Sequence, residues 1–415
     1  MLNHRFDWTR RAWCGSVAAA LAAPGRGRAQ AIPVRAITKG PGFHWFGYYD
    51  KLQFDPTSRY ALGCRGSFEH RLPTADDTLE IGVVDTEGGD RWQSLGVTHA
   101  WSWHQTCMLQ WLPGSRDEVI WNDRVDGRLV SHITNVKRGT RRTLPGPIYC
   151  LSPDARYALT TDFRRLYDVR PETGYAGVPD PRRDVAAPRD TGLWRMALDG
   201  SQPKLILSYA AALEHPLTHG GRWDKAKHWF NHLLLSPKGR RFVFLHRWRG
   251  PAEGTRFATR MFSANPDGSG LRVLDPYGKT SHFHWRDDDT LIVWADRPEA
   301  GEGWYLIHEP TGEAQPFARR EMPRNGHISY FHGGRWIVCD TGPDRERKQT
   351  VFVFDVEQRR VHEIGRYYTA PEYTGYWRCD TTPRISPDGR KVVFDSPHGG
   401  NGRQMYLADV GAVTG

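Results

Sequence analysis

The sequence predicts an all-β protein, and specifically a seven-bladed β-propeller. One pattern recurs seven times: an apolar run, a turn rich in Pro, Gly, Asp and Ser, and a second alternating run that leads back. Such a unit is typical of a β-hairpin. The copies begin mostly at intervals of roughly 45 to 55 residues, a period that indicates blades of four short strands. A pair of β-sandwiches is the alternative, but it would not repeat the same turn chemistry seven times.

The clearest copy is residues 228–248, in which an apolar run closes on Ser-Pro-Lys-Gly and a second run returns. Proline presets such a turn, and glycine accepts a positive φ. The other six copies contain, in chain order, FDPTSRYALG, WLPGSRDEVIWND, LSPDARYALTTD, HWRDDDTLIVWAD, FHGGRWIVCD and ISPDGRKVVFD. Because the copies follow one another without a linker, we expect a single propeller domain.

Residues 1–31 are predicted to be an export signal. Residues 9–13, TRRAW, resemble a twin-arginine motif, residues 15–23 form a short apolar core, and residues 29–31 fit a small-x-small cleavage pattern. The segment is too short to span a bilayer, and no later stretch is long and apolar enough to do so. We therefore expect residues 32–415 to form the propeller domain of a soluble periplasmic or secreted protein.

The net charge suits a polyanionic partner. The whole chain is formally +10, and residues 1–31 hold five Arg against one Asp, which leaves the propeller domain at about +6. The sequence has no nucleic-acid-binding motif and no Lys/Arg block, so an acidic polysaccharide is favoured over nucleic acid. A soluble surface with scattered basic residues explains the charge equally well. We expect a monomer.

The six cysteines do not predict a disulfide framework. Cys14 leaves with the signal, and none of the other five has CxxC spacing. Cys107, Cys150 and Cys339 lie in alternating apolar runs, where a free cysteine is usually a small core residue. Cys379 differs because it precedes an aspartate at the polar start of a strand.

One face of the propeller is expected to carry the chemistry. The start of each innermost strand and the end of the returning strand lie on the same face. A long insertion in the third blade, residues 162–191, overhangs this face, and loops of that length are usually functional. The polar residues collected there are His104, Gln105, Asn122, Tyr175, Arg195, Asn231, His246 and Arg247. The set fits an anionic sugar, and it lacks the paired carboxylates of a glycosidase.

Three histidines at matched positions predict a structural metal ion. His232, His282 and His327 occupy equivalent levels in the fourth, fifth and sixth blades, and Cys379 lies near that level in the seventh. Imidazole and thiolate suit zinc, and ligands from separate blades would tie the ring together. A lone histidine at a strand start is more often a hydrogen-bonded structural residue. The matched set favours zinc, with calcium or manganese as alternatives.

Five segments carry a likeness to known proteins: WHQTCMLQWLPG, RLYDVRPETGYAGVPDP, KHWFNHLLLSPKGRRFVFLHRW, SHFHWRDDDTLIVWA and WRCDTTPRISPDGRKVVFDS. Together they resemble the propeller polysaccharide lyases, namely the ulvan lyases and the oligogalacturonate lyase-like proteins. The resemblance implies a seven-bladed propeller, a structural metal in some members, and β-elimination at a uronic acid. The expected reaction cleaves an ulvan-like anionic polysaccharide and leaves a 4,5-unsaturated uronate end.

The resemblance also implies roles for single residues. His104 resembles the catalytic histidine of the family, Tyr175 its catalytic tyrosine and His246 a histidine of the substrate groove. The arginine that neutralises the uronate carboxylate is Arg195 in our interpretation.

Two features leave the assignment open. The loop at residues 180–190 makes Arg183 and Arg189 rivals of Arg195 for the neutralising role. Ulvan lyases can also carry a second histidine where this chain has Asn-Asp-Arg at residues 122–124, so the division between acid and base is not determined by the resemblance.

The elimination chemistry demands these residue types. The C5 proton of a uronate is poorly acidic while the neighbouring carboxylate is ionised, so a cation must neutralise that group. Arginine does this without losing its charge. A base then takes the proton and an acid protonates the departing oxygen, roles that histidine and tyrosine can fill.

A non-enzymatic periplasmic binding or scaffold propeller is the main alternative function. Such proteins use the same Ser-Pro-Asp-Gly turn, so the turn does not discriminate, whereas the polar residues on one face favour an enzyme. Propeller hydrolases that act on peptides are disfavoured, because the chain has no GxSxG elbow and no attached hydrolase domain.

Overall fold

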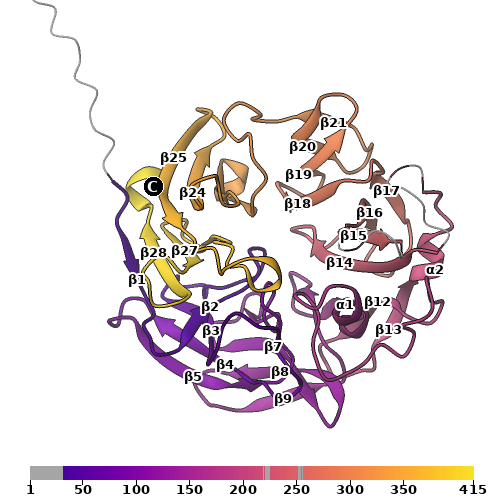
Figure 1. Ribbon diagram of the computed structural model, residues 1–415, viewed down its shortest axis with the longest axis horizontal. Helices are drawn as coiled ribbons and strands as arrows, with labels where there is room; N and C mark the ends of the chain where they lie inside the picture. The colour runs from indigo at the N-terminus through magenta and orange to yellow at the C-terminus, as the bar shows by residue number, and fades with distance from the viewer. Residues whose placement is uncertain (1–30, 218, 220–224, 251–253, 255) are drawn as a thin grey trace, which may run out of the picture. The chain divides into compact units, whose positions relative to one another are not determined.

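The computed structural model describes residues 31–217, 219, 225–250, 254 and 256–415. The predicted export signal, residues 1–31, lies outside this set except for its last residue. Residues Ile32–Gly415 form one unit. In this unit seven four-stranded sheets follow one another around a ring, as Figure 1 shows, which confirms the predicted all-β, seven-bladed β-propeller.

The first four blades each pair their strands in chain order from the innermost strand outward. The first blade contains β2 (Phe43–Trp45), β3 (Tyr60–Gly66), β4 (Leu79–Asp85) and β5 (Arg91–Thr98). The second contains β6 (Gln110–Trp111), β7 (Glu118–Val125), β8 (Arg128–Asn135) and β9 (Arg141–Leu144). The third contains β10 (Cys150–Leu151), β11 (Tyr157–Thr161), β12 (Gly192–Ala197) and β13 (Lys204–Ser208). The fourth contains β14 (Lys227–Leu235), β15 (Phe242–Arg249), β16 (Ala258–Ala264) and β17 (Arg272–Asp275).

The last three blades repeat the plan, and short helices lie between strands. The fifth blade contains β18 (Thr280–Trp285), β19 (Thr290–Arg297), β20 (Gly301–His308) and β21 (Ala314–Pro316). The sixth contains β22 (Ile328–Phe331), β23 (Trp336–Asp340), β24 (Lys348–Asp355) and β25 (Arg360–Tyr368). The seventh contains β26 (Arg384–Ile385), β27 (Lys391–Ser396), β28 (Gln404–Asp409) and β1 (Val34–Ala36). The helices are α1 (Phe163–Val169), α2 (Tyr209–Ala212), α3 (Gly411–Thr414), η1 (His332–Gly334) and η2 (Gly375–Trp377).

The strand β1 closes the ring. It is the outermost strand of the last blade and pairs antiparallel with β28, with Arg35 opposite Leu407. The Arg35 side chain reaches the first blade, where its Nε and Nη2 atoms donate to the Asp90 carboxylate at 3.0 and 2.9 Å. The repeat pattern in the sequence did not predict this strand.

The innermost strands of several blades are short, so loops rather than strands reach the axis. In the second and third blades, β6 and β10 contain two residues each. His104 and Gln105, expected at a strand start, lie instead in the loop before β6. That loop is folded on itself, because the Ser102 N–H donates to the Thr106 carbonyl at 3.1 Å.

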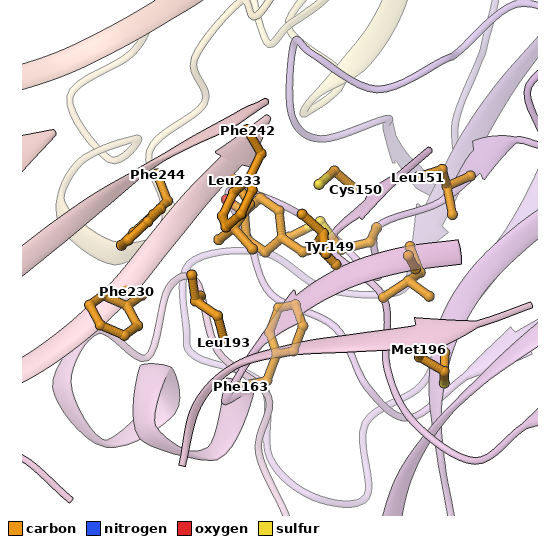
Figure 2. Close-up of a cluster of buried hydrophobic side chains, with 14 of the residues drawn as sticks. Tyr149, Cys150, Leu151, Phe163, Leu193, Met196, Phe230, Leu233, Phe242 and Phe244 are labelled. Atoms are coloured by element: carbon orange, nitrogen blue, oxygen red, sulfur yellow. The ribbon is translucent and has the colours of Figure 1, made fainter. Parts of the chain in front are cut away.

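Neighbouring blades are held together by apolar side chains. The largest cluster joins the third and fourth blades, and Figure 2 shows Phe163 of α1, Leu193 of β12, Phe230 of β14 and Phe244 of β15 within it. All four are fully buried, and burying side chains of this size contributes about 1.5 to 3 kcal/mol each. This packing fixes α1 and the insertion that contains it.

All five cysteines of the described chain are buried free thiols: Cys64, Cys107, Cys150, Cys339 and Cys379. This agrees with the absence of a disulfide framework in the sequence pattern. No helix formed by the described residues has the length and apolar character needed to cross a membrane.

We expect β1 to stabilise the propeller measurably. A chain that begins at residue 37 would leave the edge of β28 unpaired and would lose the contact between Arg35 and Asp90, so its melting temperature should fall by at least about 2 °C. A chain that begins at residue 32 is the control, and circular dichroism gives both melting curves. Identical curves would show that the seventh blade holds without its fourth strand.

Candidate active site

A cavity of about 220 Å³ lies on the axis of the ring, since all seven blades contribute to its lining. Seven residues that the sequence analysis assigned to two separate sites lie in it together. They are the predicted catalytic or substrate-binding residues His104, Gln105, Asn231 and Arg247 and the predicted metal ligands His282, His327 and Cys379.

The fourth blade shows why only some of the expected residues reach the cavity. On β15, Arg247 lines the cavity, whereas the neighbouring His246 packs on the other side of the sheet against Phe230. Successive side chains of a strand point to opposite faces, so the two residues cannot share one site. His246 Nε2 lies 3.0 Å from His228 Nδ1, and Arg260 Nε donates to His246 Nδ1 at 3.0 Å. His246 is therefore part of a buried cluster outside this cavity.

Arg247 is a buried cation. It is 8% exposed, its Nε atom has no hydrogen-bond acceptor, and no carboxylate of the described residues pairs with it. Its guanidinium stacks on the Phe257 ring at 4.8 Å. Burial, together with the nearby charge of Arg170, lowers the pKa of Arg247 to about 9. A buried charge without a partner is costly unless a ligand of opposite charge compensates it, so the cavity suits an anion.

A second guanidinium comes from the third-blade insertion. Arg170 follows the last residue of α1, and its guanidinium carbon lies 5.1 Å from the centre of the Phe257 ring that also contacts Arg247. Its Nε donates to the Glu172 carboxylate at 2.8 Å. The insertion therefore does contribute to the cavity, through Arg170 and Thr173.

The two remaining arginines that line the cavity are paired. Arg378 Nε donates to Asp380 at 2.8 Å. Arg403 Nε donates to Glu69 at 2.7 Å, and its guanidinium stacks on Trp103 at 4.3 Å. Because these charges cancel within each pair, the excess positive charge of the cavity is carried by Arg247.

His104 is a neutral imidazole in this cavity. Burial, and after it the neighbouring charge of Arg378, holds the pKa of His104 well below its usual value. Its Nε2 atom is buried without a hydrogen-bond partner in the described chain. A neutral imidazole of this kind can accept a proton.

Tyr48 lines the same cavity and keeps its proton. Burial, and after it the nearby carboxylate of Asp50, raises the pKa of the Tyr48 hydroxyl. The hydroxyl oxygen lies 3.4 Å from Nδ1 of His232. A protonated phenol can donate a hydrogen bond or a proton to a ligand oxygen.

The three histidines expected to bind a metal meet near the axis, but around a tyrosine. The centre of the Tyr49 ring lies 5.5 Å from that of His232, 5.8 Å from that of His282 and 5.3 Å from that of His327. The two ring nitrogens of His232 lie 3.4 Å from the Tyr48 hydroxyl and 3.3 Å from the Tyr49 hydroxyl. His232 is therefore engaged with phenols.

His282 and His327 form a closer pair, with ring centres 4.4 Å apart. His327 Nδ1 lies 3.0 Å from the Asp340 carboxylate, and His282 Nδ1 lies 2.9 Å from the Asn325 side-chain oxygen. Metal-binding histidines are commonly oriented through their second nitrogen in this way. The pair fits two ligands of a metal site.

The predicted four-ligand zinc site is not formed by the described residues. No three of their His, Cys, Asp or Glu side chains are grouped to hold a metal ion. The Tyr49 ring lies beside the imidazoles of His232, His282 and His327. Cys379 lines the cavity, and burial raises the pKa of its thiol.

Tyr175 and Asn122 meet away from the cavity. Asn122 Nδ2 donates to the Tyr175 hydroxyl at 2.9 Å and to the Ile148 carbonyl at 2.8 Å. Tyr175 is fully buried and stacks on Phe163 of α1 at 4.3 Å between ring centres. The two residues anchor the insertion to the second blade. The structure does not place Tyr175 where it could exchange a proton with a ligand in the cavity.

Arg195 and its two rivals also lie elsewhere. Arg195 is exposed on β12, the third strand of its blade, and stacks on Tyr157 at 4.2 Å. Arg189 is exposed in the insertion, and Arg183 lines a separate groove. Of the arginines considered from the sequence, Arg247 is the one that lines the cavity.

The polar residues of the cavity that were not predicted include Tyr48, Arg170, Arg378, Asp380 and Arg403. Tyr48 had a usable signal, because it precedes the first hairpin copy as His104 precedes the second. No sequence pattern indicated Arg170, because its position depends on how the insertion folds.

No protein-family model matches this chain, and no curated protein matches its sequence. Solved structures do match. An oligogalacturonate lyase in complex with manganese is 16% identical with a TM-score of 0.65, covering 92% of this chain and 94% of that chain. The oligogalacturonate lyase from Vibrio parahaemolyticus is 14% identical with a TM-score of 0.62, covering 91% and 94%.

The shared feature is the propeller fold. The β-propeller domain of the Trilobed protease from Pyrococcus furiosus matches as well, at 9% identity and a TM-score of 0.52, covering 88% of this chain and 96% of that chain. Because one fold hosts many activities, function has to be argued from the cavity.

We expect two buried arginines to respond in opposite ways to replacement by methionine. Arg247→Met removes an unpaired charge and should raise the free energy of unfolding by about 1 kcal/mol. Arg384→Met should lower it by about 3 to 5 kcal/mol, because Arg384 donates to the buried Asp395 at 2.9 Å. Thermal denaturation measures both. A loss for Arg247→Met as large as that for Arg384→Met would show that Arg247 has a counter-ion in the folded protein.

Proposed function

We propose that the protein is a polysaccharide lyase that cleaves a uronic-acid-containing anionic chain by β-elimination. The observation that carries the proposal is an unpaired, buried guanidinium, Arg247, in the same small cavity as the neutral imidazole of His104. This combination suits a ligand with a carboxylate next to an acidic C–H group. The likeness of fold to oligogalacturonate lyases supports the same class of reaction.

The uronate carboxylate is assigned to Arg247. A planar guanidinium can donate to both carboxylate oxygens, and the anion supplies the partner that the buried cation lacks. Neutralising the carboxylate makes the C5 proton more acidic and stabilises the enolate that forms as the proton leaves. Arg170, on the same Phe257 ring, adds to the positive potential.

The two proton transfers are assigned to His104 and Tyr48. His104 takes the C5 proton, and the electrons of that bond form the C4–C5 double bond as the bond from C4 to the oxygen of the next sugar breaks. Tyr48 gives its proton to the departing oxygen, and the arginines Arg247, Arg170 and Arg378 favour the resulting phenolate. The proton on His104 then returns to Tyr48 through solvent. The products are a 4,5-unsaturated uronate and a new hydroxyl end.

A divalent metal ion would bind at the paired histidines. Manganese is present in the oligogalacturonate lyase structure, and His282 and His327 would supply two imidazole nitrogens here. Such an ion would add positive charge to the cavity. The remaining ligands are not assembled among the described residues.

The substrate class rests on two likenesses. The sequence segments resemble ulvan lyases, and the fold resembles oligogalacturonate lyases, so ulvan and galacturonate chains are the substrates to compare. The proposal includes export to the periplasm or medium, where such polysaccharides are met, because residues 1–31 have the features of a twin-arginine signal.

We expect the purified protein to release a product that absorbs in the ultraviolet, from its new C4–C5 double bond, when incubated with a uronate polysaccharide. His104→Ala should lower kcat by on the order of a hundredfold or more, because the proton acceptor is lost. His362→Ala on the outer strand β25 is the control and should retain activity. Folded wild-type protein that releases no such product from ulvan, galacturonate and other uronate chains would contradict the lyase proposal.

We expect substitutions of Tyr48 and Tyr175 to have different effects on kcat in the same assay. Tyr48→Phe removes the proton donor of the cavity and should lower kcat by on the order of a hundredfold. Tyr175→Phe removes a hydroxyl that accepts a hydrogen bond from Asn122, so it should lower the melting temperature and leave kcat within a fewfold of wild type. A large loss of kcat in Tyr175→Phe with little loss in Tyr48→Phe would instead assign the catalytic role to Tyr175.

A further inference from the structure

We propose that a groove beside the cavity binds the sugars that flank the cleaved uronate, so that the protein acts on polyanionic chains of several residues. This inference rests on the proposed lyase function and specifies the length and charge of its substrate. The groove has a volume of about 540 Å³. The residues that carry the argument are Tyr167, Arg183, Arg249 and Tyr376.

The cavity alone is too small for a chain. Its volume of about 220 Å³ falls below the roughly 300 to 1,000 Å³ of most ligand pockets. It therefore suits about one sugar ring, whereas elimination breaks a bond between two sugars. At least one further ring has to lie outside it, and the groove offers more than twice the volume of the cavity.

The groove and the cavity are lined by neighbouring residues of the same two segments. Arg170 lines the cavity, while its neighbours Val169 and Pro171 line the groove. In the second segment, Arg378 lines the cavity and Tyr376, two residues earlier, lines the groove. A sugar chain that leaves the cavity along these two segments would reach the groove.

The groove offers cations to such a chain. Arg249 donates its Nη2 to the Val169 carbonyl at 2.9 Å and has no carboxylate partner among the described residues. The Arg183 side chain is 66% exposed, and its nearest carboxylate, Asp168, is 3.6 Å away. Both guanidiniums are therefore available for the carboxylates of successive uronates.

The acidic residues of the groove are already neutralised. Asp168 is also paired with Lys227, and Asp180 is held by the fully buried Arg165 at 3.2 Å. These carboxylates thus do little to repel an anionic chain.

Tyr376 supplies a surface for a sugar ring. It lies in η2, is 40% exposed, and shares the groove with Tyr167 of α1. An aromatic ring packs against the C–H face of a sugar, and the phenol hydroxyl adds a hydrogen bond. An exposed ring at this place can contact a ligand that extends beyond the cavity.

The test compares a single sugar that fits the cavity alone, galacturonate, with a chain, hexagalacturonate. Isothermal titration with the His104→Ala protein, which does not consume them, should give the tighter Kd for hexagalacturonate. Adding Tyr376→Ala should weaken hexagalacturonate binding roughly threefold to tenfold and leave galacturonate binding unchanged. Adding Arg183→Ala should weaken hexagalacturonate binding and reduce its dependence on salt.

Matched controls exist on other parts of the ring. Tyr368 on β25 is 48% exposed, so Tyr368→Ala tests the loss of an exposed tyrosine alone. Arg156 pairs with Asp154 at 3.6 Å, the same separation as Arg183 and Asp168, so Arg156→Ala tests the loss of an exposed cation. Neither control should change the ratio of the two affinities.

The possible outcomes test the groove proposal and the lyase proposal separately. Suppose that wild-type protein forms the unsaturated product, but the two ligands bind with the same affinity or Tyr376→Ala weakens the binding of both equally. The proposal that the groove binds flanking sugars would then be overturned, and the lyase proposal would stand. If no product forms but hexagalacturonate binds more tightly through Tyr376, the groove stands and the lyase fails. If neither ligand binds and no product forms from any uronate chain, both are overturned.

Discussion

The convergence of seven blades on one axis is the constraint on which the site depends. The loops that lead into the innermost strands share a small space whose side chains are mostly buried, so a charge there is stable mainly when it is paired. The structure pairs Arg384 with Asp395 and Arg403 with Glu69, each at low exposure. Arg247 departs from this pattern, and active sites are where proteins accept such a loss of stability.

The fold could be predicted where the sequence pattern of an element lies within a short stretch of the chain. Each hairpin has its apolar runs and its turn within about 25 residues, so the number of blades and the face that carries polar residues follow from the repeat. The strand β1 has three residues, no hairpin of its own and a partner, β28, at the other end of the chain, so no local pattern could reveal it. The position of α1 likewise depends on apolar packing against the fourth blade.

The sequence predicted which blades contribute to the candidate site, but it did not always predict which side chains line the cavity. His246 and Arg247 are adjacent on β15, and alternation sends one to the cavity and the other into a buried cluster. His232 lies at a register shift in β14 with a φ of 53°, which a simple count along the strand cannot anticipate. Tyr175 was placed by resemblance, and its hydroxyl turns toward Asn122 because the insertion folds back on the second blade.

In the proposed lyase, the charge balance of the cavity would link substrate recognition to the basicity of His104. Burial lowers the pKa of His104 most, and the neighbouring guanidinium of Arg378 lowers it further. A carboxylate bound at Arg247 adds a negative charge to the same cavity, which favours the imidazolium and makes His104 a stronger base. A neutral sugar would leave Arg247 unpaired and His104 weakly basic. Selectivity for uronates would therefore act twice, once in binding and once in the proton transfer, through the same unpaired arginine.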